Sequence, residues 1–170
     1  LDRIRQDLTD IPQIVYGVNL GITWKQFDLS LLFQGQAKVI NTIQETWVDP
    51  SSGGAGNLMQ WWTEDMWTPE NTDGTKPRLG TPNKINGTTF TNINAAFFKL
   101  KNAEIGYTLP VAVREKIGVA NARVYLSGTN LFSFDHMRGM GIDPEATGSG
   151  YGGWALNPQR LINLGVNVSF

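Results

Sequence analysis

The sequence predicts an all-β chain of five antiparallel strands, and three observations support this fold class. First, apolar and polar residues alternate with a period of two in several runs, which is typical of strands with one apolar and one polar face. Second, 19 glycines and 8 prolines among 170 residues favour turns and loops between those runs. Third, short and long connections alternate along the chain, as expected when successive strands reverse direction.

The first two strands are expected at 14–25 and 27–37. Both place apolar side chains at every second position, and only Leu32 is out of phase. The apolar row of the first strand is Ile14, Tyr16, Val18, Leu20, Ile22 and Trp24, and that of the second is Phe27, Leu29, Leu31 and Phe33. Because Lys25 and Gln26 leave room only for a tight turn, these two strands should form a hairpin.

Three further strands are expected at 97–109, 122–132 and 160–170. In the first of these the apolar phase changes part-way, and a bulge near 101–102 would bring both halves onto one face. A short connector at 110–121, with a helical turn, should join it to the next strand. The last strand alternates regularly and ends its apolar row at Phe170.

Two long loops, at 38–96 and 133–158, separate these strands. Both are rich in glycine and polar residues, and the first carries four tryptophans. A short helix is expected near 58–66. Because a loop as long as the first is unusual in a compact domain unless it has a function, both loops are candidates for a binding role.

Composition excludes several classes of function. With 14 basic and 15 acidic residues the net charge is -1, so no basic surface is available to attract nucleic acid. The absence of cysteine excludes disulfides, thiol catalysis and cysteine metal sites. No apolar run approaches the roughly 18 residues of a membrane helix. The first ten residues also lack the apolar stretch of a signal peptide.

Catalytic and metal sites find little support in the sequence. Asp143 and Glu145 could be offered as the paired carboxylates of a glycosidase, or as metal ligands together with Asp135 and His136. A turn in a surface loop explains the same residues more simply. No serine lies in a recognisable nucleophile motif. We therefore expect no enzymatic activity, no cofactor and no metal.

The order of short and long connections indicates an outer-membrane β-barrel. If the last strand runs toward the periplasm, the turn at 25–26 and the connector 110–121 lie on the periplasmic side. Both long loops then lie outside the cell, as is usual in such barrels. The strand lengths also approach the roughly 9–11 residues that cross a bilayer. The alternative is a soluble β-sandwich carbohydrate-binding module, in which the apolar faces meet a second sheet and the tryptophan loops form the site.

Six segments, in order, resemble the C-terminal part of the SusC/RagA family of TonB-dependent outer-membrane transporters. They are QIVYGVNLGITWKQFDLSLLFQGQ, MWTPENTDGTKPRLG, FFKLKNAEIGYTLP, ARVYLSGTNLFSF, GIDPEA and NPQRLINLGVNVSF. The likeness spans nearly the whole chain. It implies a transmembrane barrel of 22 strands, of which residues 1–170 supply the last five, and two long extracellular loops. The plug, the N-terminal domains and the segment that contacts TonB are expected outside this chain.

The resemblance also implies partners and a function. A SusD-like surface lipoprotein would close over the barrel as a lid, and the complex would import glycans or peptides across the outer membrane. Five aromatic residues are candidates for contacts with substrate or lid, or else for loop core: Trp61, Trp62, Trp67, Tyr151 and Trp154. Phe170 resembles the terminal aromatic that marks barrel proteins for outer-membrane assembly.

Overall fold

A computed structural model of the chain describes residues 9–43, 59–78, 89–145 and 157–170. These residues fall into two compact units, which we name the strand unit and the loop unit. The strand unit comprises Val15–Gly35, Phe97–Phe134 and Pro158–Phe170. The loop unit comprises Leu1–Ile14, Gln36–Ala96 and Asp135–Asn157. Each unit is therefore built from segments that are far apart in the sequence.

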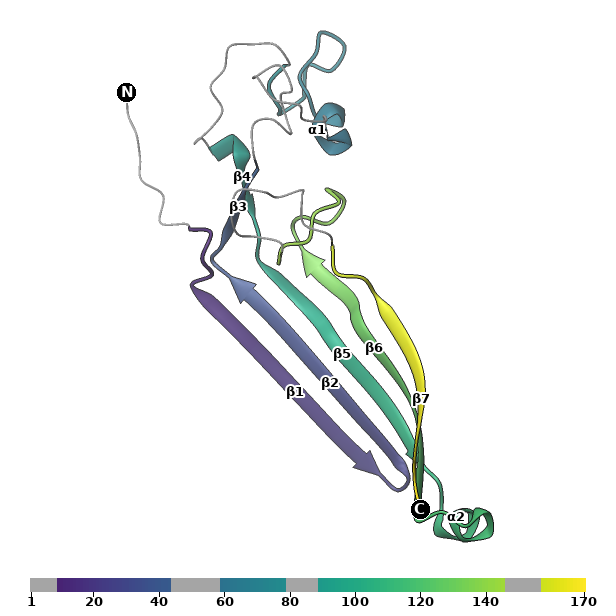
Figure 1. Cartoon of the computed structure of the whole chain (residues 1–170). Coiled ribbons are helices and arrows are strands. Elements are labelled where there is room, and N and C mark those ends of the chain that lie inside the picture. The colour runs from purple at the N-terminus through teal and green to yellow at the C-terminus, as the bar shows by residue number, and fades with distance from the viewer. Residues whose placement is uncertain (1–8, 44–58, 79–88, 146–156) are drawn as a thin grey trace. The chain divides into compact units, whose positions relative to one another are not determined.

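The strand unit is a single sheet of five strands in the order β1-β2-β5-β6-β7 (Figure 1). The strands are β1 Ile14–Trp24, β2 Phe27–Ala37, β5 Phe97–Thr108, β6 Asn121–Asp135 and β7 Leu161–Ser169. Neighbouring strands run in opposite directions (Figure 1). The all-β class and the five antiparallel strands expected from the sequence are thus confirmed. The observed ends of the strands lie within three residues of the expected ones, and the largest difference is the longer C-terminal end of β6.

One face of the sheet is apolar and uncovered. In the pairing of β6 with β7, Val124 lies opposite Val166 and Leu126 opposite Leu164, so apolar residues face one another on this side. Most of this apolar row remains exposed, from 38% at Val124 to 76% at Leu164, whereas Leu29, Leu31 and Phe33 of β2 are partly buried. The sandwich alternative requires a second sheet on this face, and the only other sheet among the described residues has two short strands.

Strand β5 changes phase along its length. Phe98 stacks on Phe33 with ring centroids 5.3 Å apart, and Tyr107 contacts Phe27 at 4.8 Å. The two β2 residues are six positions apart and share a face, whereas the two β5 residues are nine positions apart. Since an odd separation reverses the face in a regular strand, β5 must contain one extra residue. The bulge expected near 101–102 explains this geometry.

The loop unit has its own core, to which both long loops contribute. Within it, β3 Ile40–Thr42 pairs antiparallel with β4 Asn92–Asn94, which follows the 3-10 helix η3 Thr89–Thr91, and the helix α1 covers Gln60–Glu64. The buried cluster consists of Val39, Ile43, Trp62, Ala95, Met137 and Ile142. In addition, the Gln36 side-chain amide donates hydrogen bonds to the carbonyls of Ala95, at 3.0 Å, and Pro144, at 3.5 Å. The two loops therefore fold together.

A second helix, α2 Val111–Ile117, lies in the connector between β5 and β6. It ends at Gly118, whose φ of 72° is the left-handed conformation that favours glycine. The Arg114 guanidinium donates to the carbonyl oxygens of Leu109, at 3.0 Å, and Ala120, so it ties both ends of the connector together. Within the described ranges, no helix is long and apolar enough to span a membrane.

Candidate functional site

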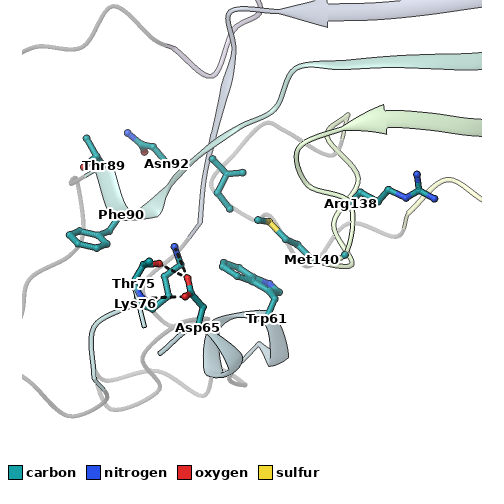
Figure 2. Close-up of a pocket in the computed structure, with 11 residues that line it drawn as sticks. Trp61, Asp65, Thr75, Lys76, Thr89, Phe90, Asn92, Arg138 and Met140 are labelled. Carbon is teal, nitrogen blue, oxygen red and sulfur yellow. Dashed lines mark hydrogen bonds and ion pairs between the residues drawn. The ribbon is translucent and has the colours of Figure 1, made fainter. Parts of the chain in front are cut away.

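The loop unit contains a pocket of about 650 Å³ between its two long loops (Figure 2). Three segments form it: α1 with the residues that follow it, η3 with β4, and the turn after β6. The lining residues are Trp61, Asp65, Thr75, Lys76, Thr89, Phe90, Asn92, Ile93, Arg138, Gly139 and Met140. A volume of this size falls within the roughly 300–1,000 Å³ that is usual for small-ligand sites.

Helix α1 sends its two adjacent tryptophans in different directions. Successive residues on a helix are about 100° apart around its axis, so the two indoles point in different directions. Trp62 is 1% exposed and belongs to the loop-unit core, whereas Trp61 lines the pocket. Their rings meet edge to face with centroids 5.5 Å apart. The Trp61 indole nitrogen is buried and has no hydrogen-bond partner in the described part of the chain.

The polar groups on one side of the pocket are already paired with one another. The Thr75 backbone N–H donates to the Asp65 carboxylate at 3.2 Å, and the Thr75 hydroxyl donates to its other oxygen. Lys76 lies 3.7 Å from the same carboxylate and also 5.6 Å from the Trp62 ring centroid. The Thr75 hydroxyl, followed by its N–H and the Lys76 charge, holds the pKa of Asp65 below its ordinary value of 3.8.

The pocket also has apolar lining residues, which are Trp61, Phe90, Ile93 and Met140. Trp61 and Met140 lie near each other, whereas the Phe90 ring points away from both (Figure 2). The Arg138 side chain extends away from Trp61 and Met140. This arrangement offers a flat aromatic surface and aliphatic walls, but no nucleophile next to a base. It is suited to binding a ligand through contact area rather than to covalent chemistry.

The acidic residues considered as catalytic or metal-binding candidates form local turns. The Asp135 carboxylate accepts the Met137 N–H at 3.0 Å, and the Asp143 carboxylate accepts the Glu145 N–H at 2.8 Å. Both bonds join residues two positions apart, which is the geometry of an Asx turn. Among the residues described by the structure, no group of three or more His, Cys, Asp or Glu side chains could hold a metal ion.

The aromatic candidates from the sequence have different surroundings. Trp61 is at the pocket and Trp62 in the core, while Trp67 is 41% exposed and outside the pocket lining. Tyr151 and Trp154 lie outside the described residues. Sequence reasoning missed Phe90, Ile93 and Met140, because the pocket joins segments that no local pattern connects. The terminal Phe170 follows β7 and is 95% exposed.

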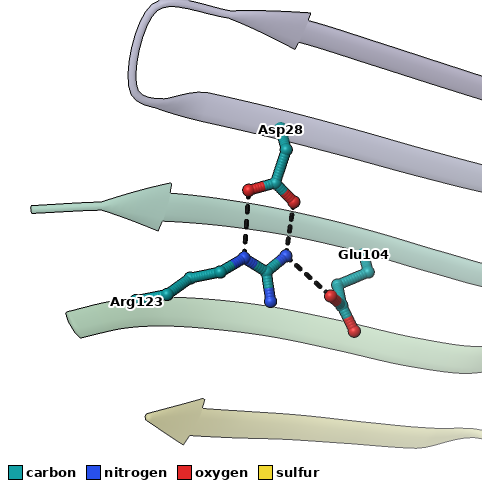
Figure 3. A network of polar contacts seen from close by, with 3 residues as sticks. All are labelled: Asp28, Glu104 and Arg123. Carbon is teal, nitrogen blue, oxygen red and sulfur yellow. Dashed lines mark hydrogen bonds and ion pairs between the residues drawn. The ribbon is translucent and has the colours of Figure 1, made fainter. Parts of the chain in front are cut away.

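A charged network crosses the polar face of the sheet (Figure 3). Arg123 of β6 extends over β5 and donates from Nε to Asp28 of β2 at 3.0 Å, and from Nη2 to the second oxygen of that carboxylate. The same Nη2 donates to Glu104 of β5 at 2.7 Å. One guanidinium thus joins three strands through charge-assisted hydrogen bonds, which are stronger than those between neutral groups.

Two glycines leave the space that this network occupies. A Cβ at Gly106 of β5 would collide with the Arg123 guanidinium, and a Cβ at Gly165 of β7 would collide with the Tyr125 ring. Tyr125 pairs with Gly165 across the β6–β7 ladder, and the Arg123 guanidinium lies 5.2 Å from the Tyr125 ring centroid. Side chains on this face therefore connect β7, β6, β5 and β2 in a continuous row.

Comparison with known proteins identifies the family. No protein-family profile matches the chain. Two curated proteins of Formosa agariphila do: TonB-dependent receptor P26 is 30% identical over 94% of the chain, and TonB-dependent receptor P3 is 29% identical over 94%. The chain belongs to the TonB-dependent receptors. It spans 17% and 16% of the length of these two receptors.

Solved structures agree with this assignment to the TonB-dependent receptors. The RagAB peptide importer in its open-open and closed-closed states matches 98% of the chain, with a TM-score of 0.72 and 27% identity in each case. A structure of the RagAB peptide transporter matches 85% of the chain with a TM-score of 0.65 and 29% identity. The matches cover 16–18% of those chains. The relatives are named as receptors and transporters, not as enzymes.

Proposed function

We propose that this chain is part of an outer-membrane importer of the SusC/RagA type, in which it forms the last five strands of a 22-stranded barrel. The apolar row of the sheet faces lipid, and the face with the Arg123 network faces the barrel interior. The two long loops lie outside the cell. Transport proceeds without covalent chemistry: a plug from the same polypeptide closes the barrel until TonB displaces it.

The observation that carries this proposal is the uncovered apolar row on a sheet whose sequence matches TonB-dependent receptors. β1 and β2 have 11 residues each and β7 has 9. These lengths are near the roughly 9–11 residues that cross a bilayer as a tilted strand. A row in which most of the large apolar side chains are 38–76% exposed would promote aggregation in water, whereas in a bilayer it meets hydrocarbon.

The partners follow from the same family. A SusD-like lipoprotein would rest on the extracellular loops as a lid, and the cargo would be an oligosaccharide or a peptide. The solved neighbours support a peptide, since RagAB is a peptide importer. Two long loops that share one folded core offer a firm surface for such a lid, because a fixed surface loses little conformational freedom on binding.

The test uses the full-length receptor in its own cells. Membranes are fractionated to locate the receptor, and uptake of a labelled peptide mixture is compared with and without functional TonB. We expect the receptor in the outer membrane and uptake only when TonB is functional. Proteases added to intact cells should cleave within the two long loops. A receptor in the soluble fraction, or cleavage only after the outer membrane is opened, would contradict the proposal.

A further inference from the structure

We infer that the pocket of the loop unit binds an apolar side chain of a peptide ligand. This inference rests on the proposed function for the source of the peptide, which reaches the extracellular loops from outside the cell. It goes further by assigning the site and the chemistry of the ligand.

The pocket lies beside the loop-unit core and exposes apolar side chains that the core does not fully cover. Trp61, Ile93 and Met140 pack against the buried cluster around Trp62 and also line the pocket. Phe90, in contrast, is 50% exposed although it lines the pocket. Apolar residues gathered in an open hollow with polar neighbours are typical of a binding site rather than of a folding core.

The walls suit an apolar side chain of moderate size. The indole of Trp61 and the ring of Phe90 supply flat surfaces, while Ile93 and Met140 supply aliphatic ones. Met140 also packs against the loop-unit core, so its position is supported from behind. A methionine side chain is unbranched and polarizable and adapts to ligands of different shape. Leucine, isoleucine, methionine or phenylalanine of a peptide would fit this environment.

The polar groups of the pocket favour such a side chain over a sugar. The Asp65 carboxylate is occupied by Thr75 and Lys76. The Asn92 side-chain oxygen accepts the Thr42 hydroxyl at 3.0 Å. A sugar ring brings several hydroxyls that each need a partner when they leave water, and these two acceptors are already engaged. The buried Trp61 indole N–H is left to donate one hydrogen bond, and a backbone carbonyl of a bound peptide supplies an acceptor for it. An apolar side chain makes no such demand.

The experiment measures peptide binding to the full-length receptor purified in detergent. The probes are blocked pentapeptides of glycine and serine in which the central residue is leucine, phenylalanine, serine or aspartate, and the readout is titration calorimetry. We expect the leucine and phenylalanine peptides to bind about ten-fold or more tightly than the serine peptide. Equal affinity for all four peptides would overturn the inference.

Variants locate the effect in the pocket. Trp61→Ala and Met140→Ala should remove the preference for the apolar residue, while the conservative Met140→Leu should retain it. Met66→Ala is the matched control, because Met66 belongs to the same unit but does not line the pocket. Loss of the preference in the control as well would show a general effect on folding and overturn the assignment.

Two other outcomes would also overturn it. One is binding of maltohexaose that Trp61→Ala abolishes, which would make the pocket a sugar site. The other is loss of the lid protein from purified Trp61→Ala receptor with peptide preference unchanged, which would make it a contact for the lid. Because binding in detergent requires neither TonB nor an energised membrane, these results are independent of the uptake test. Uptake without TonB would contradict the proposed function and leave the pocket assignment standing.

Discussion

The space above Gly106 is expected to be essential for the Arg123 network. Gly106→Ala places a methyl group where the Arg123 guanidinium now crosses β5 toward Asp28. Because the colliding atoms are at the end of a flexible side chain, the guanidinium should move rather than the backbone. The main consequence is then loss of the hydrogen bonds to Asp28 and Glu104.

The magnitude follows from how exposed these groups are. The side chains of Arg123, Asp28 and Glu104 are 20%, 34% and 37% exposed, so the network is only partly shielded from solvent. We estimate its contribution at about 1–2 kcal/mol, between an exposed ion pair and a buried charged hydrogen bond. Replacing a strand glycine by alanine otherwise stabilises by about 0.5–1 kcal/mol. Gly106→Ala should therefore destabilise the sheet in the native background and stabilise it when Arg123 is replaced by threonine.

The assay is hydrogen exchange of the full-length receptor, followed by mass spectrometry of peptides from β5 and β6. Four proteins complete the cycle: wild type, Gly106→Ala, Arg123→Thr and the double variant. The expected coupling of about 1–2 kcal/mol corresponds to roughly five- to thirty-fold in protection. Gly21→Ala serves as the control, because a Cβ there meets nothing within 4 Å. An equal effect of Gly106→Ala in both backgrounds would refute the steric explanation.

Three other outcomes are expected. Leu20→Arg on the apolar row should destabilise the assembled barrel by about 2–4 kcal/mol, and Asn19→Arg on the opposite face should have a small effect. Heat-induced unfolding followed on gels measures both effects, and a larger loss of stability in Asn19→Arg than in Leu20→Arg would show that the faces are misassigned. Phe170→Ser should reduce the amount of receptor in the outer membrane without changing the unfolding temperature of the receptor that does assemble. The control Asn167→Ser should change neither quantity. A normal amount of the Phe170→Ser receptor would exclude a role of Phe170 in assembly. Since the pKa of Asp65 is lowered in the folded chain, its contribution to stability is present above pH 3.8 and is lost as the pH falls through the lower, folded value. Proteolysis of the loop unit at decreasing pH should show this loss, and Asp65→Asn should remove the pH dependence.

The faces of the sheet could be predicted from the sequence because a strand places alternate residues on opposite sides. That rule needs no knowledge of neighbours, so the apolar rows of β1 and β7 followed directly, whereas the register that places Val124 opposite Val166 came only from the structure. Even the phase change in β5 was visible, since Phe98 and Tyr107 could share a face only through an extra residue.

The candidate site was less predictable because it depends on contacts between distant segments. Local composition identified tryptophans in the loops but could not tell that Trp61 lines a pocket while Trp62 fills a core. Met140 carries no signal of its own and becomes part of the site only when the second loop packs beside the first. The same applies to Arg123 and Asp28, which are 95 positions apart and lie two strands from each other in the sheet.

The core shared by the two long loops has a consequence for receptor engineering. A new cargo specificity can be sought by exchanging one loop between related receptors. Here a transplanted first loop would replace Val39, Ile43, Trp62 and Ala95 with the donor's residues but would meet the Met137 and Ile142 of the recipient. The chimera would then contain mismatched halves of one core. Specificity in this receptor should therefore be transferable only when residues 38–96 and 133–158 are moved as a pair.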